Sequence, residues 1–268
     1  MMRRLVVGDI HGCYDKLRDA LDRAKFNPEK DMLYSLGDFC DRGKQNKEVL
    51  DYLVSLPHFK GVFGNHDIWL KLYINCLLDT GDMRRDIFSC WMNNGGASTV
   101  NDLIPCDVPA LESYLNIIDN LFYRIELDDF ILQHNVIPSW SLTENDTYRD
   151  FKEVTLGNYK NKQFPLDELY DVTIWDRFID CLTILPTSIS SQEFAKETSK
   201  TIVCGHTITK NILNLKDFNV IDIDTGSFVG VFLPAEECGW KEDGRITVLD
   251  LDSGEAYQSG VTEIQKLW

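Results

Sequence analysis

The first 67 residues alternate between short apolar runs and amphipathic segments. The apolar runs predict three buried strands, at residues 4–7, 32–36 and 59–63. The segments between them carry apolar side chains at helical spacing and predict helices over residues 14–25 and around 49–54. This alternation is typical of parallel βαβ units, in which functional sites form at the carboxyl ends of the strands.

The hydrophobic pattern is less regular beyond the third strand. We expect a helix over residues 68–78, a mostly helical insertion over residues 79–121 and a hairpin over residues 122–133. Residues 135–200 mix polar and apolar positions and predict only a helix over residues 192–199. The strands expected in the remainder lie at residues 201–204, 220–223, 245–251 and 255–258. We interpret the last three of these as antiparallel strands.

The chain shows no internal boundary. Its length of 268 residues suits one large domain or two small ones and is sufficient for a substantial core. No linker rich in Pro, Gly or Ser separates the parallel first part from the mainly β last part. We therefore predict a single α/β domain over residues 1–268 that contains two sheets.

The charge balance narrows the choice of partners. The chain carries 27 basic and 43 acidic residues, which gives a net charge of −16. Such a field repels nucleic acids and anionic membrane surfaces, so we expect neither as a partner. It also repels phosphorylated substrates at long range, and a phosphate site here would therefore need local positive charge from metal ions and arginine.

The spacing of the cysteines and the amino-terminal sequence indicate the cellular compartment of the protein. None of the eight cysteines forms a pair with the C-x-x-C spacing, and we interpret them as reduced thiols. The apolar run near the amino terminus is too short for a signal peptide, and no stretch approaches the ~18 apolar residues of a membrane span. We therefore predict a cytoplasmic protein, and the sequence predicts no oligomeric state.

Polar residues follow the predicted strands at residues 8–12 (GDIHG), 37–43 (GDFCDRG) and 64–67 (GNHD). Four of the five histidines lie at or just beyond a strand end, beside Asp9, Asp38 and Asn65. These histidines are His11, His66, His134 and His206. Imidazole is the commonest transition-metal ligand in proteins, and a carboxylate can bridge two metals. The sequence therefore predicts a dinuclear metal site at the strand ends.

The three motifs, with the later His134 and His206, resemble the calcineurin-like metallophosphoesterases. The middle motif, with Asp41 before Arg42, resembles specifically the phosphoprotein phosphatases of bacterial type within that superfamily. The resemblance is close over residues 3–67 and rests on isolated positions over residues 130–225. It implies two mixed sheets packed as a sandwich and flanked by helices, in a four-layer α/β/β/α fold.

The resemblance also implies a ligand set. One metal would be held by Asp9, His11 and Asp38, and the other by Asp38, Asn65, His134 and His206, with Asp38 bridging. A hydroxide that spans both metals would attack the phosphorus. The implied cofactors are two divalent ions, with Mn preferred and Fe or Zn as alternatives.

Three further residues receive roles from the resemblance. His66 would protonate the leaving oxygen, Asp41 would orient His66, and Arg42 would contact only the substrate phosphate. A second phosphate-binding arginine is expected across the cleft. Our candidate is Arg177, in the sequence IWDR at residues 174–177, with four alternatives. These alternatives are Arg84, Arg85, Arg124 and Arg149.

Two residues depart from the family pattern, and one further segment matches it in a structural role. Asn135 follows His134 where family members carry small residues, and we expect its side chain to reshape the site. Asp67 replaces a Glu that is common in eukaryotic members. Residues 91–96 (WMNNGG), with Thr99, resemble a segment of bacterial members, and we interpret the glycines as closing a helix.

The leading functional hypothesis is a metal-dependent phosphomonoesterase that acts on phosphoserine, phosphothreonine or small phosphoesters. A symmetrical bis(5'-nucleosyl)-tetraphosphate hydrolase is the first alternative, since those enzymes share the metal ligands. They usually lack an aspartate at the position of Asp41 and carry proline at the position of Lys44. An inactive phosphate-binding module is the second alternative, although it would be expected to lack a ligand.

Overall fold

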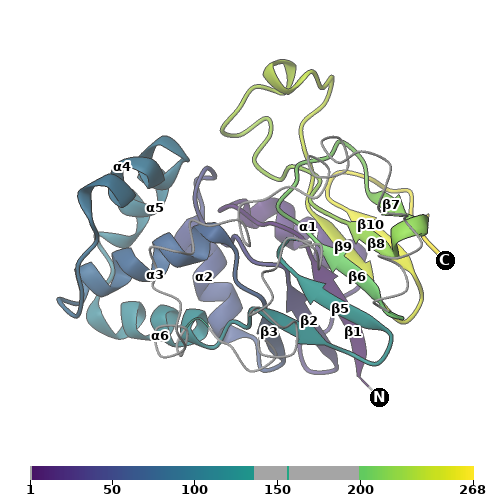
Figure 1. Ribbon diagram of the computed structural model, residues 1–268, viewed down its shortest axis with the longest axis horizontal. Coiled ribbons are helices and arrows are strands. Elements are labelled where there is room, and N and C mark those ends of the chain that lie inside the picture. Colours follow the sequence, from purple (N-terminus) through teal and green to yellow (C-terminus); the bar gives the residue numbers. More distant parts are fainter. Residues whose placement is uncertain (1, 136–155, 157–198) are drawn as a thin grey trace, which may run out of the picture.

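The computed structural model describes residues 2–135, Leu156 and residues 199–268. Two mixed sheets pack together on the right in Figure 1, with strand orders β11–β10–β9–β1–β2–β3 and β4–β5–β6–β8–β7. The strands of the first sheet are β1 (Arg3–Val7), β2 (Asp31–Ser35), β3 (Phe59–Gly61), β9 (Thr247–Asp250), β10 (Glu255–Gln258) and β11 (Gln265–Lys266). The strands of the second sheet are β4 (Arg124–Glu126), β5 (Phe130–Gln133), β6 (Thr201–Cys204), β7 (Leu213–Leu215) and β8 (Val220–Asp222).

Six α-helices accompany the sheets within the described residues. Helices α1 and α2 connect the parallel strands β1, β2 and β3, and the helices that follow β3 gather in a lobe beside the first sheet (Figure 1). The helices are α1 (Tyr14–Arg23), α2 (Asn46–Ser55), α3 (Asn65–Leu77), α4 (Arg85–Asn93), α5 (Gly96–Leu103) and α6 (Val108–Asp119). None of the helices in the described part of the chain is long and apolar enough to cross a membrane.

Strand β1 shows how the apolar pattern builds the layers. Leu5 and Val7 pack into the large core that the helices share with one face of the first sheet. Val6 points the other way, into the core between the two sheets. Complete burial of each such side chain stabilises the fold by about 1.5–3 kcal/mol. The two-sheet sandwich that the resemblance implies is thus confirmed.

The pairing of β8 corrects one prediction. The strand lies parallel to β6, antiparallel to β7, and in a different sheet from β9 and β10. The sequence predicted β8, β9 and β10 as antiparallel strands. This holds for β9 and β10, which pair with each other, whereas β8 is antiparallel to β7 on one side and parallel to β6 on the other. The three-residue strand β7 lies between β6 and β8 along the chain and is too short to give a periodic signal. The sequence therefore did not predict the hairpin that β7 forms with β8.

Helix α3 begins earlier than its apolar pattern predicts. Its first residue is Asn65, whereas apolar spacing indicated a start at residue 68. The first turn consists of Asn65, His66 and Asp67, which are polar side chains buried in the site. The helix expected over residues 192–199 falls almost entirely outside the described residues.

The segment between β8 and β9 is fixed to α1 by one lysine. Lys16 Nζ donates to the carbonyl oxygens of Ser227 at 2.7 Å, Val229 at 3.3 Å and Gly244 at 2.7 Å. These carbonyls belong to the long loop between β8 and β9, which contains the 3-10 helix η5 (Ala235–Cys238). The charged hydrogen bonds therefore hold the first and last parts of this loop against α1.

We predict that Lys16→Met lowers the free energy of unfolding by about 2 kcal/mol, because three main-chain carbonyls lose a charged donor. Urea denaturation measures this change. Lys47→Met is the matched control, since Lys47 forms an exposed pair with Asp51 at 2.6 Å that is worth only about 0.3–0.5 kcal/mol. Equal losses in the two variants would contradict the anchoring role of Lys16.

Candidate metal centre

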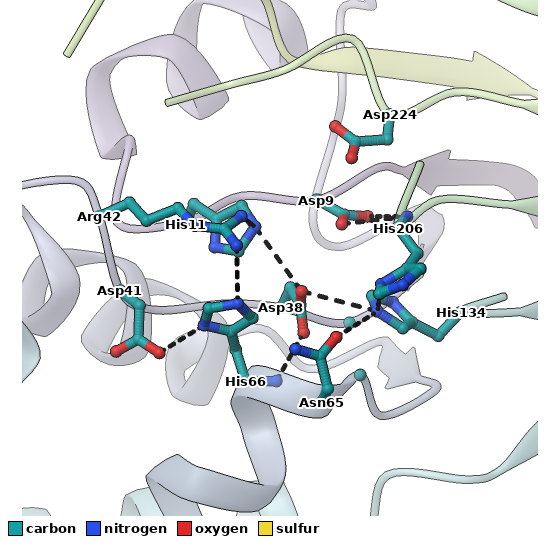
Figure 2. A network of polar contacts seen from close by, with 12 residues as sticks. Asp9, His11, Asp38, Asp41, Arg42, Asn65, His66, His134, His206 and Asp224 are labelled. Atoms are coloured by element: carbon teal, nitrogen blue, oxygen red, sulfur yellow. Dashed lines mark hydrogen bonds and ion pairs between the residues drawn. The ribbon is translucent and has the colours of Figure 1, made fainter. Parts of the chain in front are cut away.

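The carboxyl ends of five strands from both sheets meet at one place (Figure 2). Strands β1, β2, β3, β5 and β6 each lead into a turn or helix that presents polar side chains there. The predicted residues that the structure brings together are Asp9, His11, Asp38, Asp41, Arg42, Asn65, His66, His134 and His206. Arg177 lies outside the described residues.

Two histidines present the same ring nitrogen to the site. His11 Nδ1 lies 3.0 Å from the carbonyl oxygen of Cys40, and His134 Nδ1 lies 2.7 Å from that of Leu36. A carbonyl oxygen only accepts, so each Nδ1 carries the hydrogen and each Nε2 offers a lone pair. Both Nε2 atoms lie 3.6 Å from Asp38 Oδ2. This orientation is typical of histidines that bind metal.

Two further predicted ligands, Asn65 and His206, lie beside His134. His134 Nε2 is 3.3 Å from Asn65 Oδ1 and 3.2 Å from His206 Nδ1. Potential ligand atoms of Asp38, His134 and His206 all lie within 4.8 Å of one another. A second group with the same spacing joins Asp38 to His11 and His66. Asp38 is therefore the residue common to both groups, as a bridging carboxylate must be.

Buried acidic groups give the site an excess of negative charge. Burial raises the pKa of Asp38 to about 8, and burial with the nearby Asp224 and Asp38 carboxylates raises the pKa of Asp9 well above its ordinary value. Buried carboxylates of like charge are costly unless a cation compensates them. The site offers oxygen and imidazole donors and an excess of negative charge. Both properties fit divalent cations.

Asp224 is a site residue that sequence reasoning missed. It follows β8 and lies beside Asp9, and its Oδ1 accepts a hydrogen bond from the Gly226 N–H at 3.0 Å. The signal was present, because residues 222–226 (DIDTG) place carboxylates and a glycine directly after a strand, as the recognised motifs do. Asn135, in contrast, was expected beside the site and is buried next to His134.

Gly64 and Gly205 let side chains of the site approach the main chain closely. A Cβ on Gly64 would collide with Asp38 Oδ1 and the His134 ring. A Cβ on Gly205 would collide with Asp9 Oδ1. Glycine is thus required at both positions by the packing of Asp38, His134 and Asp9.

Left-handed backbone conformations concentrate in the site. Positive φ angles occur at five of its residues, which are neither glycine nor at helix ends. They are His11 at 46°, Asp38 at 51°, Asp41 at 76°, Arg42 at 68° and His206 at 67°. Each such residue costs on the order of 1 kcal/mol, and the surrounding hydrogen bonds must offset that strain.

Asp67 secures the turn that carries Asp38. Its buried carboxylate accepts hydrogen bonds from the main-chain N–H groups of Asp38 and Gly64 at 2.8 Å each and of Phe39 at 3.1 Å. The His66 N–H at the start of α3 donates to Asp38 Oδ1 at 3.0 Å. Asp67 therefore joins the loop after β2 to the loop after β3.

Asp41 and His66 form a buried pair. Asp41 Oδ2 lies 2.6 Å from His66 Nδ1 and accepts from Trp91 Nε1 at 2.7 Å, while Asp41 Oδ1 accepts from Thr99 Oγ1 at 2.5 Å. Burial raises the pKa of Asp41 to about 7, and the bonds from Thr99 and Trp91 oppose that shift. The segment with Trp91 and Thr99 thus contacts the site directly, in addition to the structural role predicted for its glycines.

Arg42 occupies the space between two histidines. Its Nη1 lies 2.6 Å from His11 Nε2, its Nη2 lies 3.0 Å from His66 Nε2, and its guanidinium carbon lies 4.2 Å from the ring centre of Phe228. The sequence interpretation expected Arg42 to contact only substrate. Among the alternative arginines, Arg84 pairs with Asp86 and Arg124 pairs with Glu126.

Residues 2–108 match the model of the calcineurin-like phosphoesterase family. This match confirms the resemblance carried by the three motifs to the calcineurin-like metallophosphoesterases over residues 2–108, and the two-sheet fold agrees with it. The family match agrees with the clusters of potential metal ligands.

Among its relatives, the chain is similar to serine/threonine-protein phosphatase 2 of Salmonella typhimurium, with 52% identity over 23% of this chain and 28% of the relative. It is also similar to the symmetrical bis(5'-nucleosyl)-tetraphosphatase of Buchnera aphidicola, with 26% identity over 80% of this chain and 77% of the relative. The alignments of higher identity thus cover only about a quarter of the relatives' own length.

The fold is similar to that of a solved structure, the cold-active protein-tyrosine phosphatase of a psychrophilic Shewanella species. That comparison has a TM-score of 0.61 and 20% sequence identity, and it covers 100% of this chain and 81% of the other.

We predict that Asp67→Asn weakens Mn²⁺ binding about 10–100-fold, because an amide replaces one of the oxygens that accept the N–H groups around Asp38. Titration of the metal-free protein with Mn²⁺ measures the affinity. Asp22→Asn is the control, since Asp22 is an exposed carboxylate on α1. An unchanged affinity in Asp67→Asn would show that Asp38 does not depend on this contact.

Proposed function

We propose that this chain is a metal-dependent phosphomonoesterase that hydrolyses phosphoserine- and phosphothreonine-type esters. The observation that carries the proposal is the buried Asp41–His66 pair, with 2.6 Å between Oδ2 and Nδ1. An alkoxide is a poor leaving group, and its departure is accelerated by a positioned acid. A nucleotide released from a polyphosphate is a better leaving group and needs such an acid less.

The six predicted ligands would hold two divalent cations, and manganese is the ion that we propose. The first set would be Asp9, His11 and Asp38, and the second would be Asp38, Asn65, His134 and His206. When bound, the cations would supply an activated water and neutralise the charge on the phosphoryl oxygens. The tautomers fixed at His11 and His134 support this assignment, because both Nε2 lone pairs face Asp38.

The chain's own residues would bind and protonate the substrate. Arg42 would hold two phosphoryl oxygens through its planar guanidinium. Once Arg42 binds the phosphate instead of His66 Nε2, that nitrogen would carry a proton and pass it to the leaving oxygen, while Asp41 fixes the opposite nitrogen. Arg177 remains our candidate for a second phosphate-binding arginine.

The second candidate is a symmetrical bis(5'-nucleosyl)-tetraphosphate hydrolase. It is favoured by the similarity to the tetraphosphatase of Buchnera aphidicola, which extends over 80% of this chain. An inactive phosphate-binding module has less support, because all the predicted ligands are present at the strand ends.

We predict that the Mn²⁺-loaded protein hydrolyses phosphoserine and phosphothreonine peptides and p-nitrophenyl phosphate with a higher kcat/KM than diadenosine tetraphosphate. Release of inorganic phosphate or of ADP distinguishes the reactions. Preference for the dinucleotide would establish the second candidate instead, and inertness toward every ester with metal bound would favour the inactive module.

We further predict that His66→Asn retains both metals and lowers kcat by about 10²–10⁴-fold, because it removes the acid. Asp38→Asn is the matched comparison and should lose metal as well as activity. Elemental analysis of the purified variants, alongside kinetics, separates the two effects. Loss of metal in His66→Asn would make His66 a ligand rather than the acid.

A further inference from the structure

Both carboxylate oxygens of Asp41 are held by side chains from the helical lobe. The residue is fully buried. Thr99 Oγ1 donates to Oδ1 at 2.5 Å and lies 3.0 Å from the Asp41 N–H, from which it accepts. Trp91 Nε1 donates to Oδ2 at 2.7 Å, on the same oxygen that faces His66. Two donors outside the strand-end motifs therefore fix the plane of this carboxylate.

The turn between α4 and α5 places these donors together. Gly95 adopts a φ of 99°, and its carbonyl oxygen accepts the Arg42 N–H at 3.0 Å. A Cβ on Gly96 would lie 2.6 Å from the Trp91 ring, so the tryptophan packs directly on the turn. The turn and its flanking helices therefore contact both Asp41 and Arg42, and they belong to the lobe beside the sheets (Figure 1).

The neighbours of Trp91 hold its ring at a fixed orientation. Tyr73 lies 5.1 Å away and Phe88 lies 6.1 Å away, measured between ring centres. The tryptophan itself is completely buried. Its N–H therefore has one defined direction, toward Asp41 Oδ2.

We propose that Trp91 and Thr99 are positioning residues that act through Asp41 to aim His66 at the leaving group. This inference rests on the proposed function, in which His66 is the acid. As the water oxygen forms its bond to phosphorus, the bond to the leaving oxygen breaks and that oxygen takes the proton from His66 Nε2. A water proton then restores His66 through solvent. A carboxylate freed to rotate leaves the imidazole misdirected and slows this proton transfer.

The leaving group provides a readout that a purely structural role would not change. Phenyl phosphate and p-nitrophenyl phosphate have similar shapes, but phenol is the poorer leaving group and depends more on the acid. We expect Trp91→Phe and Thr99→Val to lower kcat about 10-fold or more on phenyl phosphate and less than about 3-fold on p-nitrophenyl phosphate. The KM values and the manganese content should stay unchanged.

Two further variants serve as controls. Thr99→Ser keeps the hydroxyl and should restore the activity on phenyl phosphate. Phe88→Leu alters the packing around Trp91 without touching Asp41, and it should affect both esters equally and weakly. Because Thr99→Val nearly conserves volume, it tests the proposal even where Trp91→Phe fails to fold.

Some outcomes would overturn the inference. Equal losses on the two esters in Thr99→Val, or a Thr99→Ser variant as impaired as Thr99→Val, would assign these side chains a structural role only. A wild-type chain that is inert toward both esters would overturn the proposed function and the inference with it. A wild-type chain that is active, with no leaving-group effect in the variants, would overturn the inference alone.

Discussion

Three main-chain N–H groups converge on the buried carboxylate of Asp67, and the rest of the site depends on this convergence. They belong to Asp38, Phe39 and Gly64, so one side chain connects the turns that follow β2 and β3. The same contact sets the start of α3, whose first turn donates the His66 N–H to Asp38 Oδ1. A helix amino terminus stabilises a negative charge, and Asp38 therefore lies where its carboxylate is favoured.

The close approach imposed by Asp67 explains the strain and the glycines nearby. Asp38 and Asp41 adopt left-handed conformations, which residues other than glycine avoid without compensation. The compensating bonds come from Asp67 on one side and from Trp91 and Thr99 on the other. The loop after β2 is thus held between α3 and the α4–α5 turn, which fixes Asp38 and Asp41 independently.

The sequence predicted the parts of the fold and site that depend on local signals. The strands β1, β2 and β6 and the helix α1 follow from apolar spacing, and the residues Asp9, His11, Asp38, Asn65 and His66 follow from the polar ends of parallel strands. Parallel strands bring their carboxyl ends to one edge, so residues distant in the chain could be expected to meet. Their roles as ligands and acid remain predictions.

The features that the sequence did not reveal are tertiary. The parallel pairing of β8 depends on a neighbour, β7, that is too short to recognise, and the contact of Trp91 with Asp41 depends on how the lobe packs. Asp67 was treated as a loose match to the family because a Glu is common there. The structure shows instead that the shorter carboxylate fits between three N–H groups, a requirement that no local pattern displays.

The charge of the chain makes the function depend on what lies within a few ångströms of the phosphate. A net charge of −16 opposes the approach of a phosphoester, but salt screens exposed charges beyond about 8 Å at physiological ionic strength. Inside the site, the described residues place one guanidinium, that of Arg42, within the electrostatic influence of the buried carboxylates of Asp9, Asp38 and Asp224. Arg42 alone does not balance three buried carboxylates. Under the proposed function, capture of an anionic substrate would therefore require that cations be bound first. Metal affinity and phosphate affinity would then be coupled properties of the same acidic cluster.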